Sequence, residues 1–243
     1  EKDFSNYDVV FHVAGIAHIK ETPKNQELYY KVNRDLAYET ALKAKTEGVK
    51  QFIFLISMSV YGIETGIIDR NTPTKPKNAY GDSKLQAEEL ISRLADTSFI
   101  IAILRPPMVY GKNCKGNYPR LAKLALKAPV FPNIDNKRSM IYIDNLSEFV
   151  KELIDRRESG LFFPQNAEYV NTSEMVRLIA EIHGKRIFLI KMFNPILKIM
   201  NKGLVNKVFG DLVYDYSIAN EIKNIPFKKS IELTEKPREN GYA

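Results

Sequence analysis

Cysteine is almost absent from this sequence of 243 residues, and histidine occurs only three times. The single cysteine, Cys114, excludes a disulfide within the chain, and no cysteine or histidine pair has the spacing of a zinc site. We therefore expect no bound metal. An apolar run of 18 residues and an initial secretory signal are also lacking, which predicts a cytoplasmic protein without stable membrane insertion.

Long runs of one charge are missing as well. The chain has 36 basic and 29 acidic residues, which give a formal net charge of +7, but no five basic residues are consecutive. A positive excess that is spread in this way indicates solvated lysines and anionic small ligands. It does not favour nucleic acid as a partner, and no nucleic-acid motif accompanies it.

A glycine-rich phosphate turn is the third absence. Sheets that bind dinucleotides carry this turn between their first strand and the following helix, where it holds the pyrophosphate. None of the 12 glycines forms Gly-x-Gly-x-x-Gly or the looser Gly-x-x-Gly-x-x-Gly before a helix. Two alternatives follow: the protein has no dinucleotide site, or its first strand–helix–strand unit lies outside this sequence.

What is present is an alternation of apolar strands and helices. Residues 7–15, 51–57 and 98–106 are valine- or isoleucine-rich runs of the kind that form buried parallel strands. Between them lie helical patterns over residues 21–48 and 79–96. The sequence therefore predicts an α/β fold with a doubly wound, Rossmann-like parallel sheet that is only partial, since its first strands are missing.

The second half of the chain is less regular and predicts a small C-terminal substrate-binding lobe. We expect strands at 139–143, 160–165 and 186–190, a helix that Thr172 or Ser173 caps, and helical segments from about residue 190 to 224. The apolar, lysine-rich stretch 190–210 favours core helices over a membrane-surface helix. The expected cofactor domain comprises residues 1–112 and 139–163, and the expected lobe comprises residues 113–138 and 164–243.

Tyr80 and Lys84 lie four residues apart on the helix that begins near residue 79, and so share one face of it. A tyrosine hydroxyl with a pKa near 10 is a poor base at pH 7, but a neighbouring ammonium group favours the phenolate. Such a pair can move a proton to or from a sugar hydroxyl. Ser57 is the last residue of the expected strand 51–57 and Ser59 follows it, at the strand end where parallel sheets bind ligands.

Taken together, the ordered motifs "DVVFHVAG", "FIFLISMSVYG", "NAYGDSK", "ILRPPMVYG" and "RSMIYIDNL" resemble the extended short-chain dehydrogenase/reductase family, and within it the nucleotide-sugar epimerases and dehydratases. The resemblance is clear over residues 7–163 and looser beyond them. It implies NAD as the cofactor, with NADP as the alternative, and a nucleoside-diphosphate sugar as the substrate. Family members of this kind carry their glycine-rich turn upstream of the matched region.

The resemblance also implies a role for individual residues. Tyr80 corresponds to the catalytic acid/base, Lys84 to the residue that lowers the pKa of Tyr80 and holds the nicotinamide ribose, and Ser57 to the catalytic serine. Ser59 is the alternative serine and is expected to contact the substrate. The remaining implied contacts are with the cofactor at Ala14, Gly15 and Pro106, and with the substrate diphosphate at Asn117 and Arg138.

Two positions next to Ser57 separate the possible reactions. The family's 4,6-dehydratases have an Asp-Glu pair there, whereas this chain has Met58 and Ser59, which cannot exchange protons as carboxylic acids do. We therefore expect 4-epimerisation first and one-way reduction of a 4-keto sugar second. A non-catalytic nucleotide-sugar or NAD-binding fragment is the third alternative. A homodimer is expected to form through the helices near residues 25–47 and 79–96.

Overall fold

The computed structural model describes residues 2–17, 19, 21–193 and 202–236, and these residues form two compact units. Unit 1 comprises Glu1–Ile63, Asn71–Pro107 and Ser147–Pro164, and unit 2 comprises the rest of the chain. Each unit has its own buried core.

Unit 1 is built on a four-stranded parallel sheet in the order β1-β2-β4-β8. Its strands are β1 (Val9–His12), β2 (Gln51–Leu55), β4 (Ile100–Leu104) and β8 (Gly160–Phe162). The two central strands are apolar and buried, because helices cover both of their faces. The predicted α/β fold with a parallel, Rossmann-like sheet is thus confirmed.

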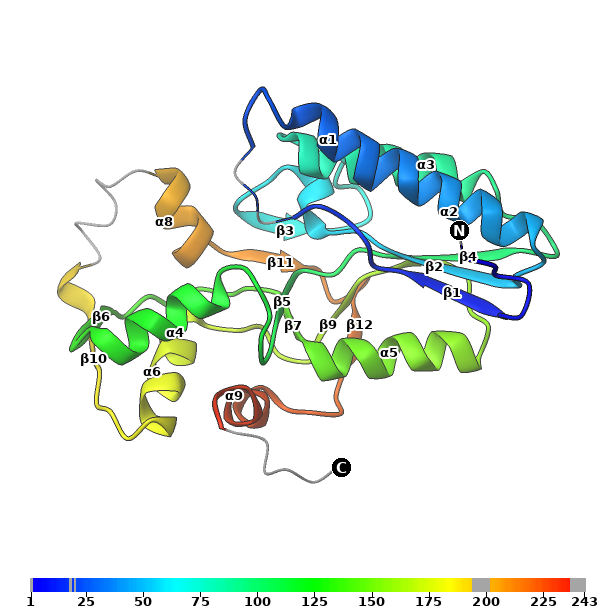
Figure 1. The fold of residues 1–243 in the computed structure, drawn as a ribbon. Coiled ribbons are helices and arrows are strands. Elements are labelled where there is room, and N and C mark those ends of the chain that lie inside the picture. Colours follow the sequence, from blue (N-terminus) through cyan, green and yellow to red (C-terminus); the bar gives the residue numbers. More distant parts are fainter. Residues whose placement is uncertain (1, 18, 20, 194–201, 237–243) are drawn as a thin grey trace. The chain divides into compact units, whose positions relative to one another are not determined.

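Four helical segments lie on one face of this sheet, and α5 (Ile143–Asp155) lies on the other (Figure 1). The first face carries α1 (Gln26–Tyr30), the π-helical turn η1 (Lys31–Asp35), α2 (Leu36–Thr46) and α3 (Ala79–Ser92). On the opposite face, Gln51 of β2 donates to the carbonyl of Leu153 in α5 at 3.0 Å. The short 3-10 turn η2 (Met58–Tyr61) follows the carboxyl end of β2.

Unit 2 contains four pairs of short strands and the helices that pack beside them. The paired strands are β5 (Met108–Tyr110) with β7 (Met140–Tyr142), β6 (Val130–Pro132) with β10 (Phe188–Ile190), β3 (Gly66–Ile68) with β11 (Leu212–Tyr214), and β9 (Pro164–Asn166) with β12 (Asn220–Ile222). The helical segments are α4 (Tyr118–Lys127), α6 (Thr172–Ile182), η3 (Lys191–Phe193), α8 (Lys202–Phe209) and α9 (Phe227–Glu235).

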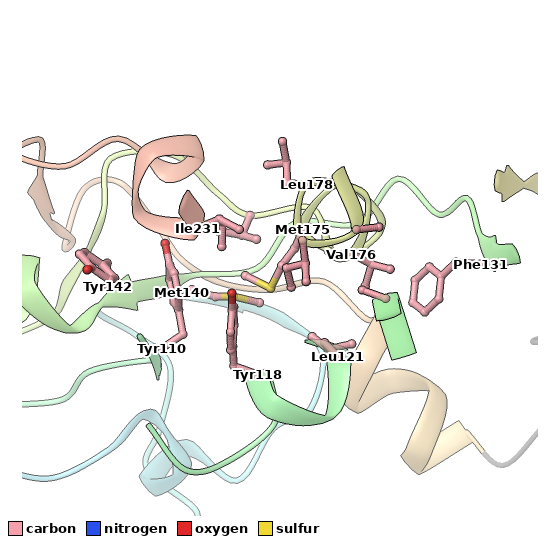
Figure 2. Packing of buried hydrophobic residues seen from close by; sticks show 14 residues of the cluster. Tyr110, Tyr118, Leu121, Phe131, Met140, Tyr142, Met175, Val176, Leu178 and Ile231 are labelled. Carbon is pink, nitrogen blue, oxygen red and sulfur yellow. The ribbon is translucent and has the colours of Figure 1, made fainter. Parts of the chain in front are cut away.

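The core of unit 2 is rich in tyrosine and methionine (Figure 2). Tyr110 stacks on Tyr118 with ring centroids 5.6 Å apart, and its buried hydroxyl shares a 2.6 Å hydrogen bond with Ser230 of α9. Burial raises the pKa of Tyr110 to about 12, so this hydroxyl stays protonated. The cluster joins α4, α6 and α9 and holds the start of α4 in place.

Three expectations from the sequence are corrected here. Residues 64–70, 108–112 and 139–146 belong to unit 2, because β3 pairs with β11 and β5 pairs with β7. The predicted helical stretch up to residue 224 contains the strands β11 and β12 instead. Asn171 caps α6 by accepting from the amide of Glu174 at 2.9 Å, whereas Thr172 and Ser173 lie inside the helix.

Two further sequence expectations concern the stretch 190–210 and the membrane. Residues 194–201 of that stretch lie outside the described residues. Within the described part of the chain, no helix is both long enough and apolar enough to cross a bilayer.

Candidate active site

The carboxyl end of β2 carries the predicted serine pair. Ser57 is extended and caps η2, since its hydroxyl accepts from the amide of Ser59 at 3.1 Å. The turn ends at Gly62, whose φ of +63° favours glycine and whose Cβ would lie 1.9 Å from the carbonyl oxygen of Lys75. Ser59 points inward, and its hydroxyl oxygen is buried without a hydrogen-bond partner in the described chain.

Helix α3 places Tyr80 and Lys84 beside this turn. The helix begins at Asn78, whose side chain accepts from the amide of Gly81 at 2.8 Å. Gly81 allows a close approach, because a Cβ there would lie 2.9 Å from the carbonyl oxygen of Ser59. The side chain of Ser57 lies close enough to the hydroxyl of Tyr80 to lower its pKa. The structure therefore brings the predicted acid/base and the predicted serine together within unit 1.

Burial dominates the electrostatics of both groups on α3. It raises the pKa of Tyr80, and the hydrogen bond with Ser57 partly offsets this rise. The net direction in this chain is opposite to the lowering that we expected from Lys84. Burial also lowers the pKa of Lys84 to about 8. A bound anion or hydroxyl ligand beside Lys84 would reverse part of this loss of charge.

Lys84 is a buried cation without a carboxylate partner among the described residues. Its ammonium group donates to the carbonyl of Leu55 at 3.2 Å and lies 4.8 Å from the ring centroid of Phe54. The other N–H groups of this ammonium can donate hydrogen bonds to ribose hydroxyls. This arrangement fits the dinucleotide ribose that the family resemblance implies as the ligand of Lys84.

The segment after β1 also fits a cofactor. Ala14 and Gly15 are exposed, and a Cβ on Gly15 would lie 2.9 Å from Oδ1 of Asn33 and 3.1 Å from Nζ of Lys84. Asn33, which is fully buried, accepts from the amide of Ile16 at 2.7 Å and donates to its carbonyl at 3.1 Å. Asn33 thus fixes the exposed backbone of this segment next to Lys84.

The π-helical turn η1 is the feature of this site that sequence reasoning missed. It places Asn33 between α1 and α2 so that its amide reaches the Ile16 backbone and, at 3.3 Å, the hydroxyl of Ser83 on α3. Single π turns occur frequently at functional sites. The helical spacing of leucines around it gives no signal for the extra residue, because the hydrogen-bond register of a helix is not visible in its apolar pattern.

His12 at the end of β1 is a second unanticipated neighbour. Its ring lies between Phe52 and Phe54, with centroid distances of 6.0 and 5.7 Å, and its Nε2 atom has no hydrogen-bond partner in the part of the chain that the structure describes. Burial, aided by the nearby charge of Lys84, lowers the pKa of His12 to about 4. The imidazole is therefore neutral at pH 7 and adds no charge beside Lys84.

The remaining predicted site residues have different surroundings. Pro106 is buried in unit 1, where its carbonyl accepts from the amide of Met58 at 2.9 Å. Asn117, in unit 2, is exposed at the start of α4, and its side chain makes no capping hydrogen bond. Arg138, also in unit 2, donates to the carbonyls of Asn206 and Gly210 at 3.2 and 2.7 Å, at the C-terminus of α8.

Comparisons with known proteins identify the relatives of this chain. A profile of the NAD dependent epimerase/dehydratase family matches residues 2–162. A UDP-glucose 4-epimerase of Vibrio cholerae is 32% identical over 91% of this chain and 72% of its own length. An N-acetyl-alpha-D-glucosaminyl-diphospho-ditrans,octacis-undecaprenol 4-epimerase of Escherichia coli O157:H7 is 30% identical over 75% of this chain and 56% of its own length.

Solved structures share the fold at low sequence identity. The crystal structure of a UDP-glucuronic acid 4-epimerase from Bacillus cereus in complex with NAD superposes with a TM-score of 0.73, at 20% identity, over 96% of this chain and 76% of that one. A dTDP-4-dehydrorhamnose reductase from Clostridium acetobutylicum gives a TM-score of 0.71 at 16% identity, over 93% and 79% of the two chains. The sequence matches are the stronger finding: this chain belongs to the NAD dependent epimerase/dehydratase family, whose members are NAD-dependent enzymes.

Proposed function

We propose that this protein is an NAD-dependent 4-epimerase of a hexose linked to a nucleoside diphosphate, with UDP as the first nucleotide to test. The observation that carries the proposal is the close approach of α3 to the turn η2, where Gly81 lies against the carbonyl of Ser59. This approach places Tyr80 beside Ser57, with Lys84 buried one helical turn further along α3. The sequence similarity to a UDP-glucose 4-epimerase supports the same reaction.

Tyr80, Ser57 and Lys84 have separate roles in the proposed reaction. Tyr80 removes the proton from the C4 hydroxyl of the sugar and returns it after the sugar has turned over. Ser57 holds the same substrate oxygen and stabilises the phenolate of Tyr80 through their hydrogen bond. Lys84 binds the ribose hydroxyls of the dinucleotide, with its charge favouring the phenolate. When bound, NAD supplies the hydride acceptor and later the hydride donor at C4.

The neighbours of Ser57 support this reaction over a dehydration. Met58 is buried and carries no exchangeable proton, and Ser59 has a hydroxyl rather than a carboxyl group. Elimination of water needs an acid and a base beside the sugar, which this turn does not offer. Reduction of a 4-keto sugar uses the same three residues as epimerisation, so it is the second candidate, and binding without turnover is the third.

The diphosphate of the substrate is proposed to bind residues of unit 2. Asn117 supports this role, because its exposed amide is free of the helix-capping bond that would otherwise occupy it. Arg138 is charged and half-buried, but its guanidinium also holds the last carbonyls around α8. Arg138 would therefore bind phosphate through those guanidinium N–H groups that do not donate to the carbonyls of Asn206 and Gly210.

A panel of diphosphate-linked sugars tests the proposed function. Full-length protein with NAD would be incubated with UDP-glucose, UDP-N-acetylglucosamine, UDP-glucuronic acid and a polyprenyl-diphosphate N-acetylhexosamine, and the C4 configuration would be followed by NMR. We expect inversion at C4 for at least one sugar without net NADH formation. Consumption of NADPH or NADH with a 4-keto sugar, and no inversion of any hexose, would indicate the reductase instead.

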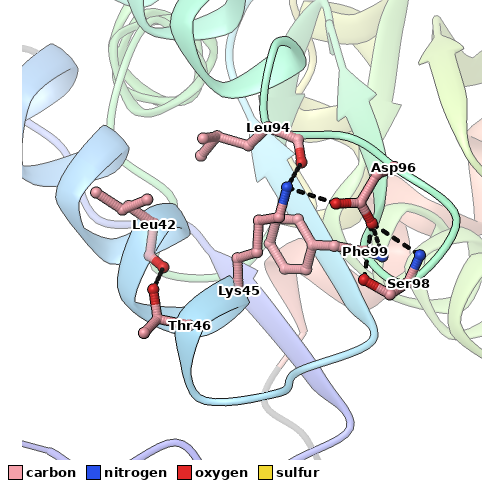
Figure 3. Close-up of polar contacts among 7 residues, drawn as sticks. All are labelled: Leu42, Lys45, Thr46, Leu94, Asp96, Ser98 and Phe99. Atoms are coloured by element: carbon pink, nitrogen blue, oxygen red, sulfur yellow. Dashed lines mark hydrogen bonds and ion pairs between the residues drawn. The ribbon is translucent and has the colours of Figure 1, made fainter.

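We also propose that the protein is a homodimer through the helices of unit 1. Three leucines on α1 and α2 are 45%, 44% and 42% exposed, namely Leu28, Leu36 and Leu42. Lys45 fixes α2 against the end of α3 by donating to the Leu94 carbonyl at 2.7 Å and pairing with Asp96 at 2.6 Å (Figure 3). Helices α1 and α2 thus present their exposed leucines as one rigid surface that a second copy of the chain can cover.

The dimer is tested by placing a charge on this surface. We expect Leu36→Glu to convert a dimer into a monomer in light scattering at micromolar protein, because the carboxylate would have to be desolvated in the interface. Leu124→Glu is the matched control, since Leu124 is 47% exposed on α4 of unit 2. A wild-type protein that is already monomeric, or a dimer that survives Leu36→Glu, would contradict the proposal.

A further inference from the structure

Unit 1 contains a buried ion pair between α3, the helix that carries Tyr80 and Lys84, and the end of β4. Glu88 is on α3, one turn beyond Lys84, and Arg105 follows the last residue of β4. Two parallel hydrogen bonds join them, from Nε of Arg105 at 3.1 Å and from its Nη2 at 2.5 Å. The side chain of Arg105 is 8% exposed and that of Glu88 is 13% exposed, so solvent screens this pair weakly.

The same guanidinium reaches the serine-bearing turn. Nη1 of Arg105 donates to the hydroxyl of Tyr61 at 2.7 Å, and the guanidinium carbon lies 5.2 Å from the centroid of the Tyr61 ring. Tyr61 is the last residue of η2, the turn that Ser57 caps. Arg105 therefore binds a residue of α3 and a residue of η2 at once.

Two separate contacts thus join α3 to η2. At one end the side chain of Tyr80 lies beside that of Ser57, and at the other end Glu88 bonds through Arg105 to Tyr61. Glu88 lies eight residues after Tyr80 on α3. Tyr61, at the end of η2, lies four residues after Ser57, which caps this turn. The backbone of Arg105 is itself held to the sheet, since its amide donates to the carbonyl of Phe162 in β8 at 2.9 Å.

We propose that Glu88, Arg105 and Tyr61 form a positioning network that sets the distance between the hydroxyls of Tyr80 and Ser57. This inference rests on the proposed function. A forked guanidinium fixes both the separation and the rotation of the two elements that it binds, which a single hydrogen bond does not do. A displacement of about 1 Å at a reacting pair lowers turnover by about 100-fold. The separation between Tyr80 and Ser57 that the network fixes therefore affects the rate of catalysis.

Arg105→Lys tests the network. Lysine keeps the positive charge opposite Glu88 but cannot bind Glu88 through two donors and Tyr61 through a third. We expect kcat to fall by about 10- to 100-fold with KM changed less than about twofold. The rising limb of the pH–rate profile should also move to higher pH, because a weaker bond from Ser57 lowers the pKa of Tyr80 less.

Tyr61→Phe is the second variant, for the case that Arg105→Lys does not fold. It removes one hydroxyl and keeps the ring beside Arg105, and we expect a smaller loss of kcat with a pH shift in the same direction. Arg177→Lys is the matched control, because Arg177 pairs with Glu174 through the same two-donor geometry on the half-exposed surface of α6. This control should leave both kcat and the pH profile unchanged.

The outcomes distinguish the inference from the proposed function. If Tyr80→Phe is inactive but Arg105→Lys and Tyr61→Phe keep the wild-type kcat and pH profile, the network is merely structural and the inference is wrong. A fall in melting temperature without the kinetic change leads to the same conclusion. If Tyr80→Phe retains turnover in the same assay, the proposed function fails, whatever the two network variants do.

Discussion

Replacement of Tyr80 by phenylalanine is expected to abolish turnover while nucleotide-sugar binding is retained. The substitution removes only the hydroxyl that bonds to Ser57, so the packing of α3 against η2 is kept. Loss of a general acid/base lowers kcat by about 10²- to 10⁴-fold. Calorimetric titration with a UDP-hexose should give a Kd within about tenfold of the wild-type value, since one neutral hydrogen bond contributes about 1 kcal/mol to binding.

Two companion variants make this experiment specific. Tyr30→Phe removes another tyrosine hydroxyl, which donates to Asp82 at 2.8 Å, and should leave kcat near the wild-type value. Ser57→Ala should lower kcat and also move the rising limb of the pH–rate profile to higher pH, because the bond from Ser57 lowers the pKa of Tyr80. Normal turnover by the Tyr80 variant would show that another group is the base.

Lys84→Met is expected to remove activity and yet to stabilise the chain when no cofactor is bound. Burial lowers the pKa of Lys84 from 10.5 to about 8, so holding its charge in the folded state costs about 3 kcal/mol at pH 7. Methionine fills much of the same space without a charge. Loss of the hydrogen bond to Leu55 offsets about 1 kcal/mol. We expect a net gain of about 2 kcal/mol in the free energy of unfolding.

The pH dependence of this gain has a definite sign. Below pH 8 both the folded and the unfolded states carry the proton, and the cost of the buried charge is fully present. Between pH 8 and 10.5 the unfolded state binds more protons than the folded state, so wild-type stability rises relative to that of the variant. The advantage of Lys84→Met should therefore shrink across this window and disappear above it.

Urea unfolding of both proteins at pH 7 and at several values up to 10.5 measures this difference. Lys151→Met is the control, because Lys151 is 65% exposed and its replacement should change stability by less than about 0.5 kcal/mol at every pH. A Lys84 variant that is less stable than wild type at pH 7 would mean that contacts of the ammonium group outweigh its desolvation. Added NAD should stabilise the wild type more than the variant, since Lys84 is assigned to the ribose.

Much of unit 1 is predictable from local patterns, and the physical reason is its buried parallel sheet. The runs that contain β1, β2 and β4 are continuous and apolar because helices cover both faces of the sheet, and such runs are visible without knowledge of their partners. The capping asparagine and the i, i+4 spacing likewise place Tyr80 and Lys84 on one helix face.

Unit 2 is less predictable, because its strands have three residues each and pair with segments far away in the chain. The strand β11 pairs with β3, more than 140 residues earlier, and the stretch around it has no period of its own. A helical expectation was wrong there because a three-residue strand is too short to show alternation. Pairing of this kind is decided by the partner, which local sequence does not contain.

The candidate site likewise combines features that the local sequence predicts with features that depend on tertiary structure. The sequence by itself predicted which side chains carry the chemistry, through the i, i+4 spacing of Tyr80 and Lys84 and the resemblance of the ordered motifs to the family. Only the tertiary structure decided their electrostatic state: burial raises the pKa of Tyr80 and lowers that of Lys84. It also decided that the π turn brings Asn33 to Ile16 and that Arg105 joins Glu88 to Tyr61. Desolvation and long-range contacts are properties of the packed chain, so no local pattern can encode them.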